Sequence, residues 1–170
     1  DRVFVLAPQM VGSWSFDDQQ SFTTIRFNVP SSSKYSALIL STHLMRIVKA
    51  YRIMTVLAST WFPPGAACFL TCWMFRTPYF VAAHGYDFLY TLHHRDRLDI
   101  LNKLVATRLL RAVFTGARGI ISNSQFTKSQ LVELGVVSKQ ICVANPGVDV
   151  RRFVPDKHLR KIVRHKYGLQ

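Results

Sequence analysis

The chain has 170 residues, 49% of them hydrophobic, and a formal net charge of +13. This hydrophobic content excludes a disordered chain, and three cysteines are too few for a fold held together by disulfides. The length is that of one ordinary globular domain. The 22 Lys and Arg residues, set against 9 Asp and Glu, would attract phosphates, anionic lipids or nucleic acid, and net charge does not choose among these.

Strand-like and helix-like segments alternate in the first half of the chain. The patterns predict a strand over 2–7, an extended run over 22–29, a helix over 36–49, a strand over 53–59 and a helix over 66–75. The uncharged stretch 53–75 is long enough to cross a bilayer. Pro63, Pro64 and Gly65 interrupt it, however, so we expect a strand-to-helix turn there instead of a membrane span.

A strand over 78–83 and a basic amphipathic helix over 97–114 follow. The predicted apolar face of this helix consists of Leu98, Leu101, Val105, Leu109 and Ala112, and its basic face of Arg97, Lys103, Arg108 and Arg111. The basic face is either simply solvated or attracted to an anionic membrane or a lipid-phosphate acceptor.

The run from 119 to 153 has the pattern of a strand, a capped helix, a strand and a turn. Ser124 is placed to cap a helix that begins at Gln125 and stops at Gly135, with Phe126, Leu131 and Leu134 as its apolar stripe. The strand around 141–144 has the composition of one buried on both faces. Pro146 and Gly147 suit the central positions of a type II turn.

This alternation predicts an α/β fold, a doubly wound Rossmann-like parallel sheet covered by helices on both faces. Ligands of such sheets bind at the carboxyl ends of the strands. His84 and Gly85 follow the strand over 78–83, and the glycine permits close approach to the backbone. Asp87 is placed to orient the imidazole or a sugar hydroxyl. A framework hydrogen bond would explain His84 as well as a chemical role does.

The three cysteines are expected to be buried free thiols in a reducing compartment. Cys68 and Cys72 lie one helical turn apart and could form half of a metal site. No second pair of Cys or His residues with ligand spacing accompanies them, so we expect no metal site.

Three segments together resemble a known family. TPYFVAAHGYD, then ARGIISNSQFTKSQLVELGV and ICVANPGVDVRRFVP, are similar to the N-terminal domain of family-4 retaining glycosyltransferases of the GT-B fold. The resemblance runs from about Ile53 to Gln170, and DRVFVLAP is similar to that family's second strand. It implies a two-domain enzyme that transfers a sugar from a nucleotide-sugar donor to a glycan, lipid-linked or small-molecule acceptor, without cofactor or metal. It also implies a catalytic position for His84 beside the donor sugar and a substrate-binding position for Gly85 and Asp87.

The resemblance implies a division into an acceptor-side domain over 1–150 and a basic linker over 151–170. The linker would lead toward a C-terminal donor-binding domain. Two family features are missing from the sequence: the first βα unit, expected ahead of Asp1, and the E-x7-E motif, because Glu133 is the single glutamate. We therefore expect this chain alone to be inactive as a hexosyltransferase. We expect a cytoplasmic protein that can associate peripherally with the inner membrane face.

Two other classes compete with this interpretation. A dinucleotide-dependent enzyme would share the alternating pattern but would carry G-x-G-x-x-G after its first strand, which this sequence lacks. A basic module that binds an anionic membrane surface or nucleic acid without catalysis would explain the charge directly. No recognised nucleic-acid motif is present, so we expect no specific nucleic-acid partner.

Overall fold

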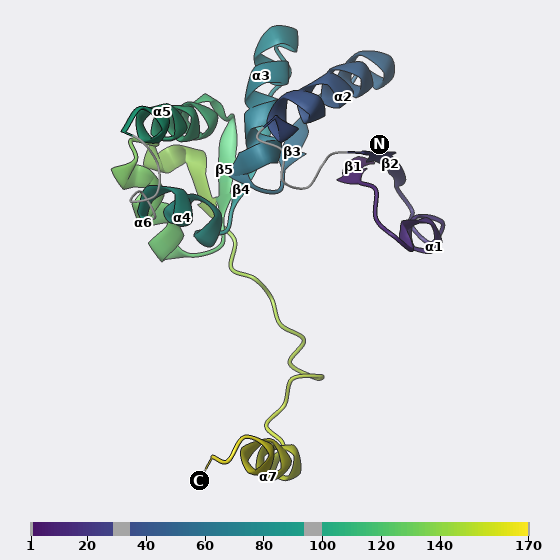
Figure 1. Cartoon of the computed structure of the whole chain (residues 1–170), viewed down its shortest axis with the longest axis vertical. Helices are drawn as coiled ribbons and strands as arrows, with labels where there is room; N and C mark the ends of the chain where they lie inside the picture. Colours follow the sequence, from purple (N-terminus) through teal and green to yellow (C-terminus); the bar gives the residue numbers. More distant parts are fainter. Residues whose placement is uncertain (1, 29–34, 94–99, 170) are drawn as a thin grey trace.

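The computed structural model describes residues 2–28, 35–93 and 100–169, and for 90–93 and 100–103 only the backbone. Strands and helices alternate as predicted (Figure 1). In chain order the elements are β1 (Phe4–Pro8), α1 (Ser13–Asp17), β2 (Thr23–Phe27), α2 (Ser36–Tyr51), β3 (Val56–Ala58), a π-helical turn (Trp61–Gly65), α3 (Ala66–Phe75), β4 (Tyr79–Ala83), α4 (Tyr86–His93), α5 (Ile100–Gly116), β5 (Gly119–Ser122), α6 (Gln125–Glu133), a 3-10 turn (Ser138–Gln140), β6 (Ile141–Val143) and α7 (Lys157–Lys166).

All described strand pairs are parallel, which confirms the α/β class. The strands do not form one sheet, however: β1 pairs with β2, and a separate sheet has the order β3-β4-β5-β6. Helix α2 connects the two sheets, because Leu40 in α2 packs with Phe27 in β2 and Ala67 in α3. Neighbouring helices α2, α3 and α5 pack against one another in turn.

Burial in the four-stranded sheet alternates along each strand. One face is buried and includes Ala58, Val81, Ile120, Ser122 and Ile141. The other face is open: Leu57, Ile121 and Cys142 are exposed, and Phe80 and Ala82 are half-buried. The expectation of helices over both faces is therefore met on one face only in the described part of the chain. Cys142 pairs with Ile121 and, like it, lies on the open face of the sheet, so the prediction that its strand is buried on both faces was wrong.

The core lies between the buried sheet face and the helices. In α5 the fully buried residues are Leu110, Val113 and Phe114, whereas Val105 is exposed. The predicted apolar face of this helix was thus displaced by about one residue, and Arg97, Leu98, Leu101 and Lys103 lie outside the described side chains. In α6, Leu131 and Thr127 are buried but Phe126 is 63% exposed.

The local signals that flank the elements are largely confirmed. Pro63 and Pro64 lie in the π-helical turn between β3 and α3, as the strand-to-helix prediction required. Within the described residues, no helix combines the length and apolar character needed to cross a membrane. Ser124 Oγ accepts from the Thr127 backbone N–H at 3.1 Å, which is the expected cap. Gly147 does not have positive φ, so the predicted type II turn is absent.

Beyond β6 the chain leaves the sheet as an extended segment and ends in α7, well away from the main body (Figure 1). Asp156 caps α7 by accepting from the backbone N–H groups of His158 and Leu159. The predicted tail of exposed basic residues is therefore partly helical. The prediction that the first domain ends near 150 is neither confirmed nor contradicted by this geometry.

Gly135, which follows α6, has φ of +93°, and a Cβ there would lie 2.6 Å from the guanidinium of Arg111. We predict that Gly135→Ala lowers the free energy of unfolding by about 1–2 kcal/mol, the cost of a left-handed conformation for a residue with a side chain. Gly147→Ala is the matched control, because its φ is not positive and nothing lies within 4 Å of the added Cβ. Urea denaturation measures the free energy of unfolding of both variants. Equal losses would contradict the conclusion that Gly135 is required by its positive φ.

Candidate functional site at the carboxyl ends of the strands

His84 follows β4 directly and is exposed to solvent. Its Nε2 lies 3.1 Å from the backbone oxygen of Ser59, which follows β3. Because a carbonyl oxygen only accepts, Nε2 carries the proton in this contact, and Nδ1 makes no contact that fixes its role among the described hydrogen bonds. The structure thus gives His84 a framework hydrogen bond while its ring stays accessible.

Asn123, which follows β5, connects three strand ends. Its Nδ2 donates to the backbone oxygen of His84 at 3.0 Å, and its Oδ1 accepts from Thr127 Oγ1 at 2.8 Å. Asn145 beyond β6 donates in turn to the Asn123 backbone oxygen at 3.4 Å. The sequence pattern of the run from 119 to 153 assigned no role to Asn123. The structure shows its role, because the side-chain amide bonds both to the His84 carbonyl and to the Thr127 hydroxyl.

Gly85 begins the first turn of α4 and has φ of +89°; it is buried, and its backbone oxygen accepts from the Leu89 N–H. A Cβ at this position would lie 3.1 Å from Thr127 Oγ1, so the close packing against α6 and the positive φ both favour glycine. The structure therefore explains Gly85 by packing, and its substrate-binding role stays a prediction.

Asp87 lies in the first turn of α4 and contacts Trp61, not His84, in its described hydrogen bonds. The backbone N–H of Trp61 donates to Asp87 Oδ2 at 3.4 Å, and the indole Nε1 donates to the Asp87 backbone oxygen at 2.8 Å. These bonds join α4 to the turn after β3. The structure places His84, Gly85 and Asp87 in one region, and the substrate role of Asp87 stays a prediction.

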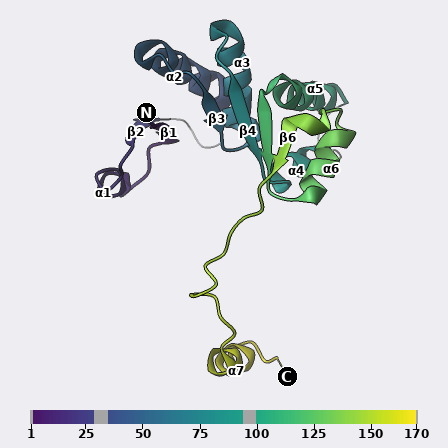
Figure 2. The same cartoon turned by 180° about the vertical axis from the view of Figure 1, so that it is seen from behind.

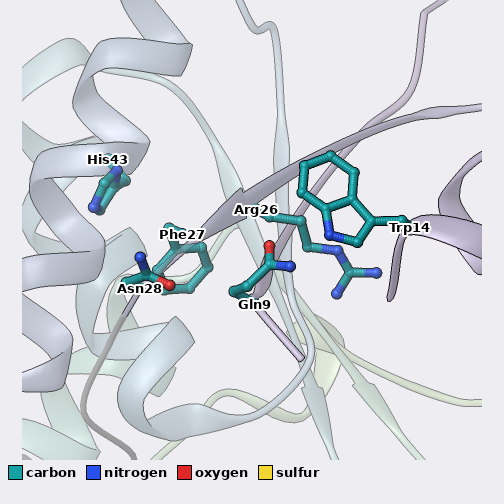
Figure 3. A pocket seen from close by; sticks show the side chains of 6 residues that line it. All are labelled: Gln9, Trp14, Arg26, Phe27, Asn28 and His43. Atoms are coloured by element: carbon teal, nitrogen blue, oxygen red, sulfur yellow. The ribbon is translucent and has the colours of Figure 1, made fainter. Parts of the chain in front are cut away.

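A second concave region lies at the carboxyl ends of β1 and β2 (Figure 3). It has a volume of about 580 Å³, within the range of small-ligand sites, and is lined by Gln9, Trp14, Arg26, Phe27, Asn28 and His43. Trp14 is 73% exposed, and its indole lies beside the Arg26 side chain in Figure 3. Sequence reasoning found no motif here, because the lining residues come from three separate segments of the chain.

Arg26 is held in a fixed orientation by two bonds to Asp17, at 2.9 and 2.6 Å, and by a 2.9 Å bond to the Pro8 backbone oxygen. The hydrogen bond from Arg26 lowers the pKa of the Asp17 carboxyl. On the neighbouring helix, the His43 ring packs on Phe27 with centroids 5.4 Å apart. The region therefore combines an aromatic surface with oriented polar groups, an arrangement suited to a sugar or another polyhydroxyl ligand.

Metal-binding groups do not cluster in the described part of the chain, where no three His, Cys, Asp or Glu side chains could hold an ion together. Cys68 and Cys72 are buried free thiols in α3. Their mutual hydrogen bond, together with burial, raises the pKa of Cys68. Cys68 and Cys72 are therefore packing residues of the hydrophobic core.

The comparisons with known proteins agree with this geometry. The fold is that of the Rossmann-like N-terminal half of GT-B glycosyltransferases. The sequence profile of Glycosyltransferase Family 4 matches residues 1–152. The chain belongs to this family, and the resemblance seen in the sequence is confirmed. A search of curated proteins found no significant match.

Solved structures show the same fold at low sequence identity. The chain is similar to HepE of Anabaena in complex with UDP-glucose, with 15% identity, a TM-score of 0.62 and coverage of 96% of this chain and 42% of HepE. A glycosyltransferase from Rickettsia africae is 13% identical with a TM-score of 0.54, and the match covers 100% of this chain and 50% of that protein. MnaA of S. aureus in complex with UDP is 14% identical with a TM-score of 0.51, and the match covers 98% of this chain and 50% of MnaA. The chain spans half or less of the length of these proteins.

The contacts of Asn123 generate a stability prediction. Asn123→Ala removes the donor to the His84 oxygen and the acceptor of the buried Thr127 hydroxyl, so we expect a loss of about 1–3 kcal/mol of unfolding free energy. Asn145→Ala removes one long bond at an exposed site and should cost less than about 0.5 kcal/mol. Thermal denaturation compares the two. A neutral Asn123→Ala would contradict a central role for this amide.

Proposed function

We propose that this chain is the acceptor-side domain of an enzyme that transfers a sugar from a nucleotide-sugar donor to a hydroxyl of an acceptor, with retention at the anomeric carbon. The observation that carries the proposal is the family match over residues 1–152. The bond from the anomeric carbon to the diphosphate oxygen breaks, and a bond to the acceptor oxygen forms. The proton of the acceptor hydroxyl passes to the departing nucleoside diphosphate or to solvent, which balances the reaction.

His84 is the residue proposed to act beside the donor sugar. Its ring is exposed at the carboxyl edge, its Nε2 is fixed by the backbone oxygen of Ser59, and Nδ1 remains for a hydrogen bond to a sugar hydroxyl. The departing diphosphate gains negative charge as the sugar gains positive charge, so positioning and charge stabilisation contribute most to the rate. HepE and MnaA were solved with UDP-glucose or UDP, which supports a uridine nucleotide as the first donor to test.

The pocket at the ends of β1 and β2 is the proposed acceptor site. Trp14 offers a surface on which a sugar ring can stack, while Gln9, Asn28 and the fixed guanidinium of Arg26 offer hydrogen bonds to hydroxyl or phosphate groups. These contacts do not distinguish a glycan from a lipid-linked or small-molecule acceptor.

Substitutions at the two regions should separate in steady-state kinetics of the natural full-length polypeptide. We predict that His84→Ala lowers kcat about a hundredfold, whereas Trp14→Ala raises the acceptor KM about tenfold with little change in donor KM. Nucleotide release is measured with a panel of nucleotide sugars beginning with UDP-glucose, and with oligosaccharide and lipid-linked acceptors. The anomeric configuration of the product, read by NMR, tests retention.

Trp73→Ala is the control, because Trp73 is an exposed tryptophan in α3 that lines neither region. If all three substitutions change the kinetics alike, neither region has the proposed role. Absence of transfer with every nucleotide sugar would count against the enzyme itself.

A peripheral attachment to anionic membranes is supported by α7. Its exposed apolar residues Leu159, Ile162 and Val163 share one face, and Lys157, Arg160, Lys161, Arg164 and Lys166 supply positive charge. Such an attachment would place the protein at the inner face of the cytoplasmic membrane, near a lipid-linked acceptor. The same attachment through α7 would also serve the alternative function, a basic module that binds an anionic membrane surface without catalysis.

Vesicle sedimentation tests this attachment. Because each basic residue near an anionic surface contributes about 1 kcal/mol, Lys161→Gln with Arg164→Gln should weaken binding to phosphatidylserine vesicles at least tenfold. Arg108→Gln with Lys128→Gln removes the same charge from exposed or half-buried sites on α5 and α6 and should have little effect. Equal losses for the two pairs would indicate non-specific attraction by net charge.

A further inference from the structure

The pocket at the ends of β1 and β2 lies in a part of the chain whose charge differs from that of the whole. The formal net charge of the chain is +13, but the charged side chains of residues 3–28 are Asp17, Asp18 and Arg26 alone, with a net charge of −1. This segment supplies every lining residue except His43. The pocket therefore lacks the local excess of positive charge that would attract an anionic ligand.

Other elements do not restore a positive charge to the lining. In both views β1, β2 and α1 stand to the side of the four-stranded sheet (Figures 1 and 2), and from outside this group only α2 contributes a lining residue. The basic residues Arg46 and Lys49 of α2 follow His43 by three and six residues, and neither lines the pocket. Within the described residues, the lining thus contains one permanently charged side chain, that of Arg26.

The charge of Arg26 is balanced inside the protein. Its Nε and Nη2 donate to the two carboxylate oxygens of Asp17, at 2.9 and 2.6 Å, so the ion pair is bidentate. The hydrogen bond from Arg26 lowers the pKa of Asp17, which keeps this carboxylate ionised at neutral pH. A negatively charged ligand beside Arg26 would therefore also meet the nearby charge of Asp17, which repels it.

The polar groups of the pocket include both donors and acceptors. N–H groups remain on Nη1 and Nη2 of Arg26 after its three described bonds. Gln9 Nε2 donates to Ser13 Oγ at 3.1 Å, which leaves Gln9 Oε1 as an acceptor, and the exposed Asn28 amide offers both kinds of group. A hydroxyl donates and accepts, whereas an ionised carboxylate only accepts. Hydroxyl groups therefore match this set of partners better than an anion does.

Aromatic rings supply the apolar part of the pocket. The Trp14 side chain is 73% exposed and lies beside Arg26 in Figure 3, and the Phe27 ring packs with His43. A sugar ring has an apolar C–H face that packs on an aromatic ring while its hydroxyls bond at the edge. The rings and the polar groups thus suit opposite parts of one uncharged sugar.

We propose that this pocket selects an uncharged sugar ring of the acceptor and that Asp17 sets the selection. The inference rests on the acceptor role proposed above. Asp17 is a positioning residue: it holds the Arg26 guanidinium in place and balances its charge, and it does not itself line the pocket. Uronic acids and sugar phosphates are rejected at this position. In a lipid-linked acceptor, a neutral sugar would occupy the pocket and the phosphate would lie outside it.

Sugar binding to the natural full-length polypeptide tests the selection without a transfer step. The probes are the methyl glycosides of glucose, galactose and mannose, each paired with the uronic acid of the same configuration. NMR titration follows the indole N–H of Trp14 and the Nε–H of Arg26. At least one neutral glycoside should shift both signals and bind at least about tenfold more tightly than its uronic acid.

Two single substitutions separate the role of Asp17 from a general effect of charge. Asp17→Asn keeps the side-chain shape and removes the charge that balances Arg26, so the ratio of neutral to anionic affinity should fall at least about tenfold. Asp18→Asn removes the same charge from the adjacent exposed residue, which has no described bond to Arg26, and should change the ratio less than about twofold. Both affinities are measured in one variant, so partial unfolding lowers both and leaves their ratio unchanged.

Three results would overturn the proposal: tighter binding of the uronic acids by the unaltered protein, equal changes of the ratio in the two variants, or no signal shift with any probe. None of them would contradict the enzyme, provided that sugar transfer to other acceptors responds to His84→Ala as predicted. Selective binding of a neutral sugar without any transfer would instead contradict the proposed enzyme and support the selectivity of the pocket.

Discussion

The parallel ladder between β4 and β5 is the interaction on which the rest of this structure depends. Val81 pairs with Ile120, both are almost fully buried, and the α5 residues Val113 and Phe114 belong to the same core. Because the strands run parallel in fixed register, their carboxyl ends meet at one edge. That register brings His84 and Asn123 into contact, although they are far apart in the sequence. The candidate site is thus a direct consequence of strand pairing.

In the candidate site, a few hydrogen bonds hold the backbone of the strand ends in place. Asn123 joins the ends of β4, β5 and β6, and Asp87 and Trp61 join α4 to the turn after β3. These contacts leave the His84 ring exposed on a fixed backbone, as its proposed role beside a ligand requires. The pocket around Trp14 is built on the other sheet, and α2 connects the two through Leu40. The region around His84 and the pocket around Trp14 are therefore held by one framework, as the proposed donor-side and acceptor-side roles require.

The open strand edges and the open sheet face both leave parts of a parallel sheet without the cover that such sheets normally have. A parallel sheet satisfies its backbone groups only through neighbouring strands, and it buries its apolar side chains only under helices. Leu57 lacks both kinds of cover among the described residues, since its side chain is 60% exposed and no described strand pairs with β3 on the side away from β4.

The sequence by itself determined the elements, the fold class and the family, because these depend on local signals: the Ser124 cap, the Gly135 stop, the prolines before α3 and the order of the motifs. It placed the buried side of α5 about one residue away from Leu110, because helical periodicity allows neighbouring faces and packing against the sheet selects one. Only the tertiary structure decided the rest. It gave Gly85 a packing role against Thr127, assembled the pocket around Trp14 from separate segments, and divided the strands into two sheets. Strand pairing and side-chain contact between distant segments are long-range properties, and local pattern carries no information about which edge remains unpaired.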